Sequence, residues 1–248
     1  MTSRRTLILP VLGLGVAQVM PAQTITDTPS RKYSVWNPTI EKAFKAVQDR
    51  RFQAAKALLK PCLEAIPNHF EAHYFLALMD FGGKDYPSAL KHLDVSEQTL
   101  MELAKEFSAQ EADMKARAQA AEQEALDNLS TASSRGQTRS LAGLNQDLKI
   151  AQDKAKPSKN LQQPYAVPAD YLFFRGNVLL RLDRREEART AYRRAVSADS
   201  THANAWNNLI ALGLGAKDSA GTKADLAAAD VSGVVIRPDL KKAVEAMP

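Results

Sequence analysis

The four histidines are the residues of this chain that come nearest to metal chemistry. His69 and His73 are four residues apart and would share one face of a helix, while His92 and His202 stand elsewhere in the sequence. The pair has the order His-Phe-Glu-Ala-His. A zinc hydrolase helix instead carries His-Glu-x-x-His, in which the glutamate serves as general base. We therefore predict no metal site and no bound cofactor.

Other patterns typical of catalysis are not found in the sequence either. Gly13 and Gly15 lie in an apolar N-terminal run, and Gly82-Gly83 falls between predicted helices, so no glycine-rich loop is placed to bind phosphate. Cys62 is the only cysteine, which excludes an intramolecular disulfide and a cysteine-rich metal site. No serine lies in a nucleophile elbow. We predict that the protein is not an enzyme and takes no small-molecule substrate.

Basic residues gather in one stretch, where they alternate with acidic residues on predicted helix surfaces: Arg181, Arg184, Arg185, Arg189, Arg193 and Arg194. This alternation predicts a solvated helix face rather than a site for an anion. The formal net charge of +5 falls to +3 without residues 1–22, which contain Arg4 and Arg5 and no acidic residue. Because no basic stripe with interleaved aromatic residues is present, we predict no nucleic-acid partner.

The elements that hold these residues are indicated by internal repetition. Three positions return after 34 residues: Phe52, Ala55 and Leu59 recur as Tyr86, Ala89 and Leu93. A small residue stands twelve positions before the alanine of each copy: Ala43 before Ala55, Ala77 before Ala89, and Gly176 before Ala188. Small residues at this spacing would let two antiparallel helices approach closely.

The pattern resembles the tetratricopeptide repeat, a pair of antiparallel helices with a length of 34 residues. The best matches are residues 70–103 and 169–210, and Pro67 stands where the first repeat should close. The resemblance implies an all-α fold: a tetratricopeptide-repeat helical array, or α-solenoid, with an inserted long helical hairpin. The fourth repeat departs from the pattern because Ile210 replaces the usual glycine, and its second helix is hard to place.

A segment is inserted between repeats two and three, because Ala89 and Ala188 are 99 residues apart, which is not a multiple of 34. Residues 88–134 contain no proline or glycine, and a seven-residue spacing typical of coiled coils runs through them: Leu93, Leu100, Phe107, Met114 and Ala121. We predict a helix over about 88–129, roughly 63 Å long. A second run of regularly spaced apolar residues, from Leu141 to Ala155, predicts a returning helix and therefore a helical hairpin. It either packs back on the repeats or forms an arm that binds a partner or dimerises.

The N-terminus has the features of a secretory signal peptide. Arg4 and Arg5 precede an uncharged run from Thr6 to Met20, and small residues follow. The apolar part spans about 14 residues, whereas a membrane-spanning helix needs about 20. We expect a bacterial protein that is exported to the periplasm or secreted. The alternative is an inner-membrane protein anchored by an uncleaved N-terminal segment.

The predicted organisation therefore has seven parts. They are a signal peptide (1–22), a flexible N-terminal segment (23–35), repeats one and two (36–103), an inserted coiled-coil-like hairpin that overlaps the end of repeat two (97–160), a linker (161–168), repeat three with a partial repeat four (169–216), and a C-terminal extension (217–248).

The family resemblance implies that the first helix of each repeat lines a concave groove. The implied groove residues are Glu71, Tyr74, Phe75, Leu78, Asp170, Phe173, Phe174, Asn177, Asn204, Asn207 and Asn208. Phe173 and Phe174 stand where a clamp for chaperone tails needs cations, so that use is not expected. Trp206-Asn207-Asn208-Leu209 is similar to the asparagine ladder with which sugar-transferase superhelices hold peptide backbone.

These residues imply a protein or peptide partner. The predicted function is a non-enzymatic adaptor or scaffold in the bacterial envelope. The alternative is a structural assembly factor that self-associates through the 97–160 hairpin.

Overall fold

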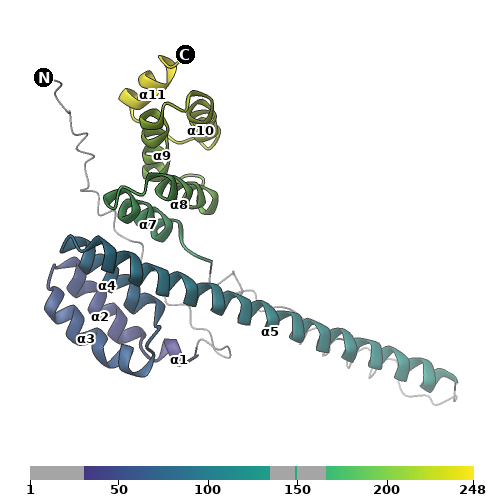
Figure 1. Ribbon diagram of the computed structural model, residues 1–248. Helices are drawn as coiled ribbons and strands as arrows, with labels where there is room; N and C mark the ends of the chain where they lie inside the picture. The colour runs from purple at the N-terminus through teal and green to yellow at the C-terminus, as the bar shows by residue number, and fades with distance from the viewer. Residues whose placement is uncertain (1–30, 135–148, 150–165) are drawn as a thin grey trace, which may run out of the picture.

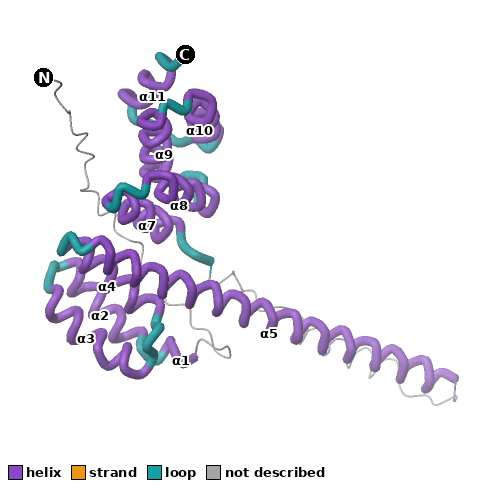
Figure 2. The backbone as a smooth tube through the Cα atoms, viewed as in Figure 1, coloured by secondary structure: helices purple, strands orange, loops and turns teal. Residues whose placement is uncertain are grey.

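The computed structural model describes residues 31–134, 149 and 166–248, and every regular element in them is a helix. The helices are α1 (Arg31–Ser34), α2 (Asn37–Gln48), α3 (Phe52–Ala65), α4 (Phe70–Gly82), α5 (Tyr86–Ser134), α7 (Ala169–Arg181), α8 (Arg185–Ala198), α9 (Ala203–Ala216), α10 (Ser219–Val231) and α11 (Pro238–Glu245). Short turns join most neighbouring helices (Figure 2), and α5 projects far beyond the other described helices (Figure 1).

The helices pack as four successive pairs: α2 on α3, α4 on α5, α7 on α8, and α9 on α10. The turn inside each pair contains one non-glycine residue with positive φ: Arg50, Lys84, Asp183 and Lys217. The first two of these residues are 34 positions apart, and so are the last two. The predicted all-α repeat array is therefore confirmed, and α10 is the second helix of repeat four that the sequence left unplaced.

Small side chains let the paired helices approach. Ala77, Ala89 and Ala188 have no exposed surface. At Gly176 a Cβ atom would overlap the ring of Tyr192, and at Gly213 it would overlap the side chain of Thr222. The spacing of small residues in the sequence therefore marks real points of close helix contact.

The array is continuous across the insertion. Helix α5 packs on α7 as well as on α4. One hydrophobic core contains Ala89 and Leu93 from before the insertion together with Leu172, Tyr192 and Trp206 from after it. Repeats two and three therefore stack as consecutive repeats even though a long segment separates them in the sequence.

Helix α5 has 49 residues, which corresponds to roughly 74 Å. The apolar residues that recur every seven positions along it fall into a buried group and an exposed group. Leu100 and Phe107 are buried with Tyr33 and Ile66 in a cluster beside the array, whereas Met114 is 54% exposed. The helix thus packs beside the array as far as Phe107, which includes the residues 97–103 that the prediction shared between repeat two and the insertion. We call residues 108–134 the arm.

Several predicted segments lie outside the described residues, namely the signal peptide over 1–22 and most of the returning half of the hairpin. The end of the predicted flexible segment 23–35 forms α1, and Tyr33 in it is only 5% exposed. Among the described helices, none combines the length and the apolar character that a membrane span requires.

The C-terminal extension packs against repeat four. Helix α11 packs on both α9 and α10, and it buries Leu240 and Val244 in the same core as repeats two to four. It lies where the first helix of a fifth repeat would begin. Helix α11 thereby covers apolar surface of repeat four.

Candidate partner-binding site

The predicted groove residues lie on the first helix of repeats two, three and four. We call them the first-helix row: Glu71, Tyr74, Phe75 and Leu78 on α4, Asp170, Phe173, Phe174 and Asn177 on α7, and Asn204, Asn207 and Asn208 on α9. Their spacing of three or four residues places them along one side of each helix. Asp170 and Asn204 are exposed, Phe75 and Phe174 are buried, and the remaining members are partly exposed.

Two of the aromatic residues belong to the core instead of a binding surface. Phe75 is 7% exposed, and its ring centroid lies 5.5 Å from that of Phe44 in the preceding repeat. Phe174 is 8% exposed and meets Phe81 edge to face at 5.3 Å. Both side chains fill the space between stacked repeats. We therefore correct the prediction that they contact a partner.

Two other aromatic residues keep partial access to solvent. Tyr74 packs against Tyr171, with centroids 5.4 Å apart, and its ring is nearly perpendicular to that of Phe174 at 5.9 Å. Phe173 lies 4.9 Å from the ring of His202 and 5.8 Å from that of Tyr192. These contacts already restrict the two rings, so less side-chain entropy is lost when a partner binds to them.

Asn177 and Asn208 form a cluster with Tyr192. The Tyr192 hydroxyl donates to Asn177 Oδ1 at 2.8 Å. Asn208 Nδ2 lies 3.1 Å from Asn177 Oδ1 and 3.2 Å from the Tyr192 oxygen, and it donates to both. Burial raises the pKa of the Tyr192 hydroxyl, which therefore stays protonated as a donor. The Asn208 amide nitrogen is thus already used inside the array, which the sequence did not indicate.

Asn207 holds a main-chain group, as the Trp-Asn-Asn-Leu pattern implied, but the group belongs to this chain. Its Oδ1 atom accepts the backbone N–H of Arg237 at 3.0 Å, and its Nδ2 atom donates to the Ala203 carbonyl at 2.8 Å. The amide therefore fixes the start of α11. Asn204, one turn earlier on α9, is exposed.

The two carboxylates of the row have different surroundings. His202 accepts the Ala205 backbone N–H at Nδ1, so its Nε2 carries the proton and donates to Asp170 Oδ1 at 3.1 Å. Glu71 makes no hydrogen bond or ion pair with any described residue, and burial raises the pKa of its carboxyl group to about 7. His202 was not predicted as part of the site, although it stands at the same repeat position as His69.

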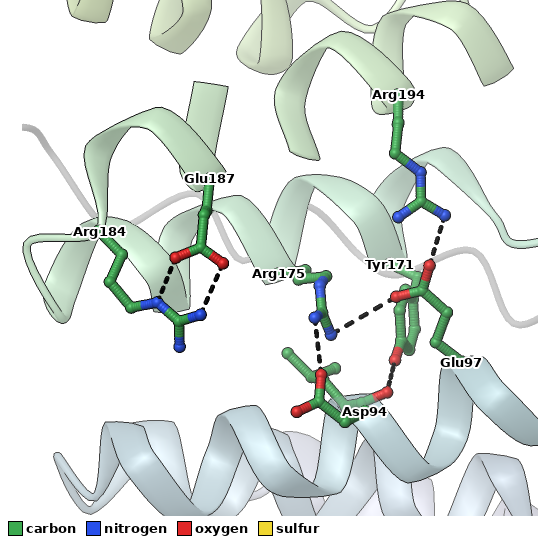
Figure 3. A network of polar contacts seen from close by, with 8 residues as sticks. Asp94, Glu97, Tyr171, Arg175, Arg184, Glu187 and Arg194 are labelled. Carbon is green, nitrogen blue, oxygen red and sulfur yellow. Dashed lines mark hydrogen bonds and ion pairs between the residues drawn. The ribbon is translucent and has the colours of Figure 1, made fainter. Parts of the chain in front are cut away.

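A polar network joins α5 to repeat three beside this row (Figure 3). Arg175 on α7 pairs with Asp94 at 2.6 Å and with Glu97 at 3.4 Å, and Arg194 on α8 donates to Glu97. The Tyr171 hydroxyl donates to the Leu93 carbonyl. Glu97 is only 7% exposed. No repeat pattern signals these contacts, because they join residues on either side of the insertion.

The histidine pair that meets in space is His73 with His92. His73 Nε2 lies 2.7 Å from the Pro67 carbonyl and must donate to it, so the two Nδ1 atoms, 2.9 Å apart, are left to share a proton. His69, the predicted neighbour on a helix face, is completely buried. Within the described part of the chain, no group of three or more His, Cys, Asp or Glu side chains is placed to hold a metal ion.

Comparison with known proteins agrees with the geometry of repeat three. The family model of the tetratricopeptide repeat matches residues 169–202, the segment that contains α7 and α8. The chain therefore contains a tetratricopeptide repeat at these residues. No curated protein matches the chain, and no solved structure matches it. Tetratricopeptide repeats generally mediate contacts between proteins, which supports a protein partner for this chain.

Proposed function

We propose that this protein is an adaptor or scaffold of the bacterial envelope that holds a protein or peptide segment against the first-helix row. The observation that carries the proposal is the continuity of the array. Repeats two and three share one core across the insertion, so α4, α7 and α9 are the first helices of consecutive repeats. This supports the inference that their partly exposed side chains act as one surface. No catalytic role is needed for any of them.

Within the row, the contacts favour certain residues as points of attachment. Tyr74 and Phe173 are aromatic, partly exposed and held by neighbouring rings, and such residues dominate the free energy of many interfaces. Asn204 is exposed and can donate to and accept from a peptide backbone. Phe75 and Phe174 are buried and pack against rings of neighbouring repeats, so they position the helices that carry the row.

Site-specific photocrosslinking in cells tests this role. A benzoylphenylalanine placed at Phe173 or Asn204 should give a discrete crosslinked product with a partner protein. The same group at Thr190 or Glu186, which are exposed on the second helix of repeat three, should give none. Equal products from both helices, or none from the first-helix row, would contradict the proposal.

Export is part of the same proposal, because the N-terminal sequence supports it and an envelope partner requires it. Sequencing of the N-terminus of the native protein should show a start near Gln18 or Gln23. A soluble cytosolic protein that retains Met1 would exclude export, and a membrane-bound protein that retains Met1 would instead support an uncleaved anchor.

The arm favours a second candidate function, which is self-association. Met114 is 54% exposed and Leu126 is 45% exposed on the projecting part of α5. Phe107 and Val167 belong to one cluster, so a short glycine-serine linker can replace residues 108–165. A dimer that becomes monomeric on this replacement, measured by sedimentation, would favour the scaffold function. A monomer before and after would exclude it.

A further inference from the structure

The charged side chains of the first-helix row are all acidic. Glu71 and Asp170 carry carboxylates, and no lysine or arginine stands among the other members of the row. The chain as a whole has the opposite sign, with a formal charge of +5. Asp170 accepts a hydrogen bond from the neutral ring of His202, whereas Glu71 has neither a hydrogen bond nor an ion pair with any described residue. The row therefore offers carboxylates without a pairing cation, and that of Glu71 has no polar partner among the described residues.

The surroundings of Glu71 make this charge costly in the absence of a ligand. The carboxyl group is partly withdrawn from water, and burial alone raises its pKa to about 7. The Cys62 thiol lies nearby, and its pKa is raised to about 11 by burial and by the charge of Glu71. A poorly solvated carboxylate is stabilised when a cation comes within a few ångströms of it.

An aromatic ring lies close to the same place. Tyr74 follows Glu71 by one helical turn and is partly exposed. The charge of Asp170 from the next repeat also acts on the Tyr74 hydroxyl, whose pKa is raised by burial and then by that charge. The ring thus lies near the carboxylate of Asp170, and Glu71 stands three residues before it on the same helix. The face of a tyrosine ring attracts a lysine or arginine side chain, and nearby carboxylates strengthen the attraction.

We propose that the first-helix row binds a peptide segment with a lysine or arginine side chain, whose cation pairs with Glu71 beside Tyr74. This inference rests on the proposed function, because it names the chemistry of the partner for the same surface. It also predicts a proton linkage. The Cys62 thiol and the Tyr74 hydroxyl stay neutral between pH 6 and 8, whereas the Glu71 carboxyl, with a pKa of about 7, changes charge in this range.

A library of random dodecapeptides displayed on phage is the probe that tests the inference. Selection on the wild-type protein should enrich peptides with lysine or arginine. The enrichment should be lost on Glu71→Gln, which keeps the shape of the side chain and removes its charge. It should persist on Glu186→Gln, which neutralises an exposed carboxylate on α8. Phe173→Ala should weaken binding of all selected peptides.

The outcomes separate the inference from the proposed function. Selected peptides without basic residues that depend on Phe173 would overturn the inference and leave the binding surface in place. Basic peptides that bind Glu71→Gln equally well would also overturn it. If no peptide is enriched, or if none depends on Phe173, both the surface and its specificity are wrong.

The proton linkage gives a second readout on the best selected peptide. Affinity for the wild-type protein should rise about 10-fold from pH 6 to pH 8, because the ionised fraction of a group with a pKa near 7 rises by about that factor. Other charged groups of the protein and the peptide also respond to pH, so the comparison must be made with Glu71→Gln. That variant should lose the dependence, and an equal rise in both proteins would contradict the assignment.

Discussion

Asn207 Oδ1 accepts the backbone N–H of Arg237 at 3.0 Å, and this bond joins the first helix of repeat four to the start of α11. The bond satisfies a backbone donor that helix geometry leaves without a partner at the start of a helix. The C-terminal helix is therefore fixed to the array by a side chain of the array as well as by its own apolar residues Leu240 and Val244.

Replacement of Asn207 should loosen the C-terminal helix. Asn207→Ala leaves the Arg237 N–H without its acceptor, and we expect the unfolding free energy to fall by about 1 kcal/mol. Hydrogen exchange should show faster exchange in 237–245 and little change in α4. Asn204→Ala, on the exposed side of α9, serves as the matched control and should be close to neutral. Equal exchange in both variants would count against the assigned bond.

Gly176 should tolerate no larger residue. A methyl group at this position overlaps the Tyr192 ring, so Gly176→Ala should lower the unfolding free energy by about 1–3 kcal/mol. Gly215 provides the control, because a Cβ there meets nothing within 4 Å. Gly215→Ala should be neutral or should stabilise by up to about 1 kcal/mol, since alanine favours helix. Urea denaturation of both variants measures the difference, and similar midpoints would contradict the close contact.

Glu97 should matter more for stability than an exposed acid in the same network. Glu97→Gln removes the charge that faces Arg175 and Arg194, and we expect a loss of about 1–3 kcal/mol. Glu187 pairs with Arg184 at 2.6 Å, but both side chains are largely exposed. Glu187→Gln should therefore change the stability much less than Glu97→Gln does. Thermal unfolding gives both values, and a Glu97→Gln protein as stable as the wild type would show that the network does not hold α5 to repeat three.

His69 should make the protein less stable in acid. Burial lowers its pKa to about 4, with the Tyr33 carbonyl acting in the opposite direction. An unfolded histidine has a pKa near 6.5. The unfolded chain therefore takes up a proton below pH 6.5 while the folded chain does not. The stability from neutral His69 is complete above pH 6.5 and is lost as the pH falls towards 4.

The measurement is the unfolding free energy of the wild type and of His69→Phe at pH 7 and pH 5. Glu71 acts in the opposite direction, because its raised pKa of about 7 favours the folded state at low pH. Both proteins contain Glu71, so the difference between their unfolding free energies isolates the effect of His69. Relative to the wild type, His69→Phe should gain about 2 kcal/mol at pH 5 compared with pH 7. A difference that does not change with pH would show that His69 is not buried as a neutral ring.

The repeat fold could be predicted from the sequence because its determinants are local and periodic. Ala77, Ala89 and Ala188 stand at fixed spacings where two helices cross, and only small side chains allow that crossing. The seven-residue spacing in 88–134 likewise indicated one long helix before any contact was known, and the structure has it as α5. For the same reason the sequence placed α7 and α8 correctly, since both belong to the repeat with the clearest pattern.

The exposure of the candidate site could be decided only by the tertiary structure. Phe173 and Phe174 are neighbours of the same type, yet Phe174 faces Phe81 of another repeat and is buried, while Phe173 keeps access to solvent. The internal use of Asn207 depends on Arg237, 30 positions away, and that of Glu97 on Arg194, 97 positions away. Local periodicity determines which residues share a helix face, but the stacking of distant helices determines which of them still reach a partner.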